Sequence, residues 1–345
     1  MNRKNIISAI IFLLLAALTF RVILKGNDMG EVVVAIQELK KGYLIAAAAA
    51  ALFFVAVEGV MIWYLLRALQ EPAELYRCIR YSFVGFFYSG ITPSATGGQP
   101  VQLYYMQKDG SKVSNSTVVL MTVAVIYKLV LVVMGVGILM FYHKPLAEYL
   151  KNYMYLYYLG LFLNVVLVAV LLFIMISPKC FLAIVTGGEK LLKKMHILKH
   201  SKERTERLIE MAEQYHEAVL FFGKNKGKIV VVIAVTFLQR CSVFFMTYLI
   251  YRGMGMQGKS MLTVMIVQAS VYIAVDMLPL PGAQGITEMM YKTAFVQIFP
   301  GAYLTASMCV TRGLNFYLLL LISAVMAMWC QFQSGRNYKE EQKIV

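Results

Sequence analysis

Long apolar runs separated by short polar joints make up most of the chain. A helix needs about 20 apolar residues to cross the hydrocarbon core of a bilayer. Runs of this length lie at 5–24, 43–66, 116–142, 153–176, 229–251 and 303–332. Arg3 and Lys4 precede the first run, and no small-residue cleavage site follows it. The pattern therefore predicts about six full membrane spans, the first being an uncleaved signal anchor.

Two further apolar segments are interrupted by helix-breaking residues. The short segment 81–91 runs into GITPSATGGQP at 90–100, and segments 262–278 and 286–299 flank LPLPGAQGITE at 278–288. Proline and glycine end helices. Inside a bilayer, broken backbone is tolerated only where protein packs around it or water reaches it. Two such breaks in matching halves of a chain are typical of the central site of a transporter.

Composition agrees with a membrane protein. The 345 residues are 60% hydrophobic and 15% charged, and the mean hydropathy is +0.67. The formal net charge is +15, but the basic residues lie mainly in the polar joints. There they indicate membrane topology and contacts with anionic lipid rather than nucleic-acid binding. The five cysteines are scattered and show no metal-binding spacing, so neither a metal nor a cofactor is predicted.

The distribution of basic residues also predicts orientation. The region 178–228 is the most basic, which places it in the cytoplasm together with both termini and the joint 67–80. Lys108 and Lys112 then fall on the cytoplasmic side as well, so the first broken segment must enter and leave from that face. The same reasoning makes 262–299 enter and leave from the opposite face. This predicts an inverted repeat with two oppositely oriented re-entrant hairpins.

The expected fold is therefore an all-α polytopic membrane protein with six spans and two hairpins. In the alternative fold of eight spans, 262–278 and 286–299 each cross the bilayer completely. We expect one domain over 1–345, with a first half at 43–142, a cytoplasmic helical region at 178–228 and a second half at 229–332. Five apolar residues recur at helical spacing in that region, which predicts an amphipathic helix on the membrane or on the bundle: Leu208, Met211, Tyr215, Val219 and Phe222.

Ionisable residues within spans are costly and usually functional. Arginine is the strongest candidate, because its planar guanidinium binds a phosphate through two hydrogen bonds and stays charged. The alternative is that these residues form ion pairs between helices. The candidate head-group residues in apolar segments are Arg240, Arg312, Glu58, Asp276, Glu288 and Lys128, with Lys292 as a further cation.

The two breaks supply neutral partners for a head group. Exposed backbone N–H groups at their glycine turns and at the ends of half-helices attract anions. The candidates are Thr92, Thr96, Gly97, Gly98, Gln99, Gln102, Pro281, Gly282, Gln284 and Gly285. Nearby tyrosines are expected to serve packing or the membrane interface more than the transport path: Tyr88, Tyr104, Tyr105, Tyr272 and Tyr291.

Catalytic chemistry finds little support in the sequence. All four histidines lie in polar joints, and His196 and His200, four residues apart, lack an evident third metal ligand. No nucleotide-binding glycine loop is present.

The motif TPSATGGQP at 92–100, Arg240 downstream and the segment 279–288 resemble the membrane region of lysylphosphatidylglycerol synthase/flippase proteins, the multiple peptide resistance factor family. The resemblance covers about residues 5–332 and implies a flippase that moves aminoacylated phosphatidylglycerol between leaflets, which protects against cationic peptides. Longer members carry a soluble C-terminal domain that transfers lysine from tRNA to the lipid. This sequence ends soon after its last span, so we expect no lysyltransferase activity and a cargo that could differ.

Together these observations predict a lipid translocase of the bacterial inner membrane with both termini in the cytoplasm. Its expected partner is an anionic or aminoacylated phosphatidylglycerol; a separate lipid-modifying transferase and a homo-oligomer remain open. One alternative is an accessory subunit that binds a glycosyl- or aminoacyl-transferase through its basic region. The other is a transporter of small solutes or ions, whose cavity would be closed to lipid.

Overall fold

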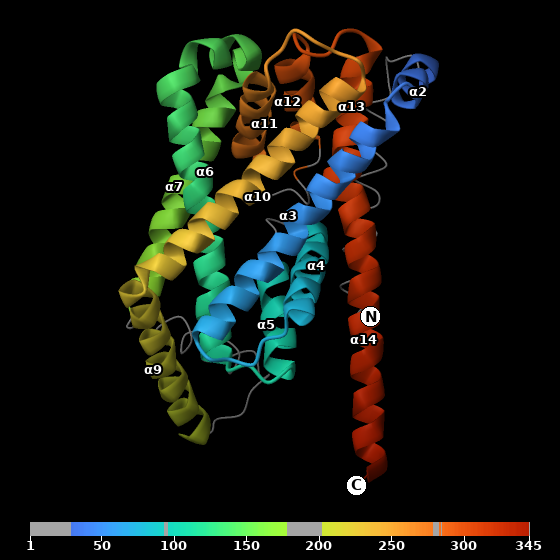
Figure 1. Ribbon diagram of the computed structural model, residues 1–345. Coiled ribbons are helices and arrows are strands. Elements are labelled where there is room, and N and C mark those ends of the chain that lie inside the picture. The colour runs from blue at the N-terminus through green and yellow to red at the C-terminus, as the bar shows by residue number, and fades with distance from the viewer. Residues whose placement is uncertain (1–28, 93–95, 178–201, 279–282, 284, 345) are drawn as a thin grey trace.

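The computed structural model describes residues 29–92, 96–177, 202–278, 283 and 285–344, and within these ranges the regular elements are helices (Figure 1). The long helices are α3 (Lys41–Ala68), α6 (Val113–Leu150), α7 (Met154–Ile176) and α10 (Lys226–Gly253). A shorter helix, α13 (Ala302–Arg312), continues through a π-helical segment (Gly313–Leu318) into α14 (Leu319–Ile344). The all-α polytopic fold is confirmed.

Within the described residues, four helical stretches are long and apolar enough to cross a membrane: Lys41–Ala68, Val113–Ile176, Lys226–Gly253 and Ala302–Gln331. The second stretch contains both α6 and α7, which a short 3-10 turn (Lys151–Tyr153) connects and which pack side by side (Figure 1). The predicted spans at 43–66, 116–142, 153–176, 229–251 and 303–332 therefore fall on these helices. The span predicted at 5–24 lies outside the described residues.

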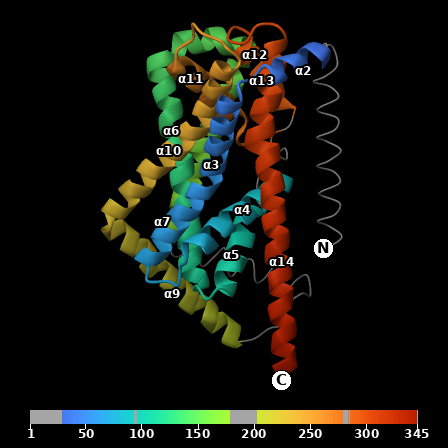
Figure 2. The same cartoon turned by 45° about the vertical axis from the view of Figure 1, so that its right-hand side comes forward.

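Helices α3 and α10 form the central pair of the bundle and lie side by side in both views (Figures 1 and 2). Small side chains on α3 allow this approach, because Ala47 and Ala51 are completely buried. The amide of Gln239 on α10 donates a hydrogen bond to the carbonyl oxygen of Phe54 on α3 at 2.6 Å. A polar contact therefore fixes the register of the two helices near their middles.

Two pairs of short helices lie at opposite ends of the bundle (Figures 1 and 2). One pair is α4 (Leu75–Ile91) and α5 (Gly98–Lys108); the other is α11 (Met261–Val275) and α12 (Ile286–Phe295). With 15 and 10 residues, α11 and α12 extend only about 22 Å and 15 Å at 1.5 Å per residue, against roughly 30 Å of hydrocarbon. This geometry favours re-entrant hairpins over the alternative of two complete spans at 262–278 and 286–299.

Helix α9 (Lys202–Lys224) covers the end of the bundle where α6 begins (Figure 1). Tyr215, Val219 and Phe222 are buried, and burial raises the pKa of Tyr215 to about 12. Ser114 of α6 donates a hydrogen bond to the side chain of Gln214 at 2.8 Å. The predicted amphipathic helix thus packs on the bundle over this part of its length, while the side chains of 202–212 lie outside the description.

The π-helical segment joins α14 to the tip of the first hairpin. Phe316 and Leu320 form a small apolar cluster with Ile91 at the end of α4. A Cβ atom on Gly90 would lie 2.8 Å from the side chain of Leu320, so the glycine permits this contact. The helix α2 (Met29–Gln37) packs against α13 at the other end of the bundle.

Candidate functional site

Arg240 lies at the middle of α10 and is completely buried. Its guanidinium carbon is 3.3 Å from the centre of the Tyr127 ring, 4.8 Å from that of Phe54 and 5.4 Å from that of Tyr272. All three guanidinium nitrogens lack a hydrogen-bond partner among the described residues. A desolvated cation–π contact contributes roughly 2 kcal/mol, whereas each unsatisfied buried donor costs about 1–3 kcal/mol. The rings therefore offset only part of this cost.

Glu58 on α3 connects the surroundings of Arg240 to the first hairpin. The side-chain amide of Gln102 on α5 donates a hydrogen bond to its carboxylate at 2.8 Å. Arg240 attracts this carboxylate electrostatically, but the two groups form no direct ion pair. A Cβ atom on Gly85 of α4 would lie 2.4 Å from the Gln102 amide nitrogen. The glycine therefore leaves the space through which Gln102 reaches Glu58.

The second hairpin is connected to α6 by two contacts. Lys128 forms an ion pair with Asp276, which follows the last turn of α11. One turn earlier on α11, the hydroxyl of Tyr272 shares a hydrogen bond of 2.6 Å with the hydroxyl of Tyr127. Since both tyrosine rings face Arg240, the same contacts that hold the hairpin also enclose the guanidinium.

A further ion pair joins the second hairpin to α13. Arg312 donates to the carboxylate of Glu288 at 2.8 Å, and the side chains are 12% and 4% exposed. The other carboxylate oxygen accepts a hydrogen bond of 2.6 Å from the backbone N–H of Gly285. Through this hydrogen bond, Glu288 caps the start of α12. Gly285 itself has a φ of 85°, a conformation suited to glycine.

The alternative that these charged residues form ion pairs between helices therefore applies to Lys128 with Asp276 and to Arg312 with Glu288. For these four residues the structure shows ion pairs between elements. Lys292 lies one turn after Glu288 and is half-buried. Arg240 differs from the other cations because its nitrogens are left for an acceptor that the described residues do not supply.

The break of the first hairpin corrects one expectation. Thr92 donates to the carbonyl oxygen of Tyr88 at 2.7 Å and accepts from the N–H of Gly97 at 2.9 Å. A Cβ atom on Gly98 would lie 2.1 Å from the Ser89 hydroxyl oxygen. The N–H of Gly97 is thus bonded to Thr92 within the turn and is not presented to an anion as expected, while Gly98 brings α5 against α4.

The remaining predicted residues divide by position. Gln102 reaches the centre, whereas Thr96 and Gln99 are exposed at the start of α5. Gly285 lies at the start of α12, as predicted for a residue of the second break. Three predicted residues lie outside the described part of the chain: Pro281, Gly282 and Gln284. The histidine pair His196 and His200 lies outside it too.

Sequence reasoning missed two rings that define the site, Phe54 and Tyr127. Phe54 precedes Glu58 by one helical turn, and Tyr127 is adjacent to Lys128, so each lies beside a residue that was singled out. That proximity was the available signal, but ring orientation is decided by packing between distant helices. The expectation that tyrosines serve packing holds for Tyr291, which stacks on Phe295, whereas Tyr272 faces Arg240.

Comparison with known proteins agrees with this architecture. The family model described as "Lysylphosphatidylglycerol synthase TM region" matches residues 5–323, which is most of the chain. A comparison with curated proteins gave no match. The chain is therefore a multi-pass membrane protein that belongs to the lysylphosphatidylglycerol synthase TM region family.

Proposed function

We propose that this protein translocates a phospholipid with an anionic phosphate, such as lysylphosphatidylglycerol, between the leaflets of a bacterial inner membrane. One observation carries the proposal: the fully buried guanidinium of Arg240 has no hydrogen-bond partner among the described residues, although it lies at the middle of a membrane-spanning helix. An arginine is rarely kept in this state unless a ligand or partner satisfies it.

The surroundings of Arg240 suit a lipid phosphate. Three rings lie within 5.4 Å of the guanidinium carbon, and all N–H donors point outward along the edge of the group, where an oxyanion would bind. Two phosphate oxygens match that edge. Glu58 and Gln102 link the same centre to the first hairpin, and Tyr127 and Tyr272 link it to the second. Under the proposal, the head group passes between the hairpins while the acyl chains stay in the bilayer.

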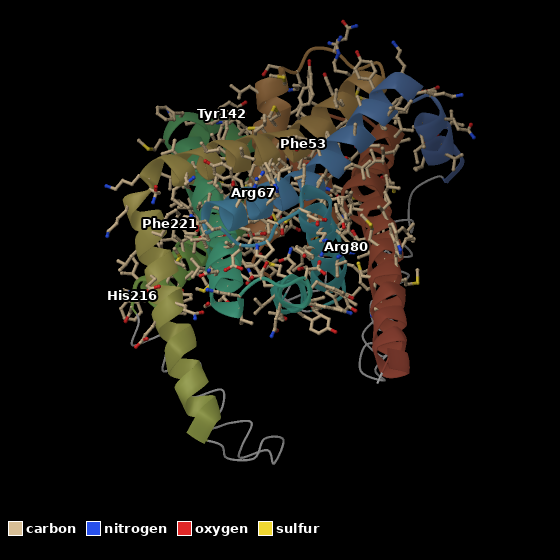
Figure 3. The ribbon with its side chains drawn as sticks, turned by 60° about the horizontal axis from the view of Figure 1, so that its bottom comes forward. Phe53, Arg67, Arg80, Tyr142, His216 and Phe221 are labelled. Atoms are coloured by element: carbon tan, nitrogen blue, oxygen red, sulfur yellow. The ribbon has the colours of Figure 1, made fainter. Side chains whose placement is uncertain are left out.

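The proposal includes no covalent step, so the protein acts as a carrier and not as a lysyltransferase. Both termini would lie in the cytoplasm, on the side of the bundle where α9, Arg67 and Arg80 lie (Figure 3). Movement of an aminoacylated lipid to the outer leaflet would reduce the negative surface charge and hence the binding of cationic peptides.

The test is lipid movement in proteoliposomes. Fluorescent phosphatidylglycerol and lysylphosphatidylglycerol would be followed by quenching of the label in the outer leaflet. We expect Arg240→Ala to reduce the rate by at least about tenfold, the loss expected for one charged hydrogen bond of 1.5–3 kcal/mol. Arg67→Ala, at an exposed position on α3, is the matched control. Movement at the wild-type rate in Arg240→Ala would overturn the assignment. Uptake of free glycerol phosphate without lipid movement would instead support the small-solute alternative.

A further inference from the structure

Glu58 stands apart from the other acids at the centre. Asp276 pairs with Lys128, and Glu288 pairs with Arg312. Glu58 is half-buried and accepts a hydrogen bond from a neutral amide, and within the described residues it has no cation at ion-pair distance. The ring of Phe54, one turn before Glu58 on α3, lies 4.8 Å from the guanidinium carbon of Arg240, and the charge of Arg240 favours the ionised form of Glu58.

Among the described residues of the elements around Glu58, no cation lies at ion-pair distance from its carboxylate. On α6, the ring of Tyr127 lies at Arg240, and Lys128 is already bound to Asp276. From α4, Cys78 and Ile79 pack against Gly59, the residue after Glu58. The π-helical segment contains Tyr317 as its one titratable side chain. Neutralising the charge of Arg240 therefore makes the ionised form of Glu58 less favourable.

We propose that a proton on Glu58 accompanies the anion on Arg240, so that the two sites together carry an electrically neutral load across the membrane. This inference rests on the function proposed above and adds a source of energy to it. A phosphate that binds to Arg240 neutralises the charge of the guanidinium. The carboxylate of Glu58 would then be a second negative charge without a nearby cation. An unpaired carboxylate in an apolar interior neutralises rather than stays charged.

The step balances without other reactants. A proton from the aqueous side to which the site is open adds to a carboxylate oxygen of Glu58, and no bond in the lipid is broken. The other oxygen still accepts the hydrogen bond from Gln102, because a protonated carboxyl keeps acceptor capacity. When the lipid leaves toward the opposite leaflet, Arg240 again balances the carboxylate, and the proton is released on that side.

The first experiment measures protons during binding. Purified protein in a weakly buffered solution with a pH-sensitive dye would be titrated with short-chain phosphatidylglycerol. We expect the wild type to take up about one proton per lipid bound, as linkage requires when the bound state holds one more proton. Short-chain phosphatidylcholine carries the same phosphate with its own positive charge and should cause no uptake. Glu58→Gln should bind phosphatidylglycerol without uptake, and Glu148→Gln, the same change at an exposed position, should behave as wild type.

The second experiment measures energy coupling in proteoliposomes whose membrane potential is clamped to zero. With a gradient of one pH unit, we expect labelled phosphatidylglycerol to accumulate about tenfold in the leaflet on the alkaline side, since one proton per lipid is worth 1.36 kcal/mol per unit. In Glu58→Gln the distribution should not respond to the gradient. With the gradient removed, a membrane potential should leave the wild-type distribution unchanged, because the load is neutral.

The outcomes separate the two proposals. If the wild type binds lipid without proton uptake, or moves lipid without response to the pH gradient, the proposed proton coupling is wrong. Neither result contradicts the proposed lipid translocation. Absence of any lipid movement in the wild type overturns the translocase, whereas the binding titration still decides whether Glu58 and Arg240 are coupled. Both decisive measurements use the wild-type protein, so they hold even when a variant is inactive.

Discussion

At the residue scale, the buried guanidinium of Arg240 is a cost to the stability of the fold. Cation–π contacts with Tyr127 and Phe54 stabilise the charge, but the N–H donors remain unsatisfied within the described residues. The charges of the second hairpin are different, because Asp276 and Glu288 form direct ion pairs. We therefore expect substitutions at Arg240 and at the ion pairs to have opposite effects on stability.

Arg240→Met keeps much of the side-chain length and removes the buried charge. We expect the protein to be equally stable or more stable by up to about 4 kcal/mol, since apolar replacement of buried charged groups is often neutral or stabilising. Lipid movement should be lost at the same time. Thermal unfolding in detergent, measured beside the proteoliposome assay, checks both. Destabilisation by more than about 2 kcal/mol would show that the guanidinium holds the fold together.

The Glu288–Arg312 pair calls for a double-mutant cycle. Glu288→Gln or Arg312→Met alone should cost about 3–5 kcal/mol, because each leaves a charge buried without its partner. The double variant should cost less than the sum of the two. Glu74→Gln, which removes an exposed partner of Arg77, should cost about 0–1 kcal/mol and serves as the control. Additive effects at Glu288 and Arg312 would mean that their interaction does not contribute to stability.

At the scale of elements, small residues determine how closely the hairpins pack. Gly85 gives Gln102 its path to Glu58, and Gly98 brings α5 against Ser89. On the opposite side of the bundle, a Cβ atom on Gly160 of α7 would lie 2.3 Å from the carbonyl oxygen of Ile273 on α11. Both hairpins therefore depend on glycine at the place where they meet a neighbouring helix.

Gly85→Ala should displace the Gln102 side chain from Glu58. We expect a stability cost of about 1–3 kcal/mol, which is typical of overpacking, together with slower lipid movement. Combining it with Gln102→Ala should restore stability, because the clash is removed, but not lipid movement. Gly137→Ala is the control, since a Cβ atom there meets nothing within 4 Å. Recovery of lipid movement in the double variant would show that the contact between Gln102 and Glu58 is dispensable.

The elements could be read from the sequence more fully than the site. Apolar runs of about 20 residues correspond to α3, α6, α7 and α10, and the proline–glycine breaks mark both hairpins. The paired charges were also named, because ionisable residues in apolar runs are conspicuous. The roles of Phe54 and Tyr127 were not, since each is one aromatic among 44 Phe, Tyr and Trp residues. Gly97 was assigned to anion binding although its N–H is bonded to Thr92, because a turn and a binding loop have the same local composition.

At the scale of the whole molecule, the two hairpins enter the bundle from opposite ends (Figure 2). Such an arrangement lets a site at the middle be reached from one side while the opposite hairpin closes the other. Arg240 meets the second hairpin through Tyr272 and, through Glu58 and Gln102, is connected to the first. A movement of either hairpin would therefore change the surroundings of Arg240.

Labelling from the two sides of the membrane tests this arrangement. In a variant without native cysteines, Lys108→Cys lies at the base of the first hairpin and Gln257→Cys before the second, both at exposed positions. We expect a membrane-impermeant maleimide to label Lys108→Cys only from the cytoplasmic side and Gln257→Cys only from the other. Labelling of both positions from one side would contradict the inverted arrangement.

The π-helical segment Gly313–Leu318 has a consequence for the continuous rod formed by α13 and α14. A π turn accommodates one residue more than an α turn, so the segment shifts the angular phase of everything that follows it by about 100°. Before the shift, Arg312 points to Glu288 on one hairpin; after it, Leu320 meets Ile91 and Gly90 on the other. Deleting a single residue within 313–318 would restore uniform α-helical winding. The rod would then keep the contact of Arg312 with one hairpin or that of Leu320 with the other, but not both at once.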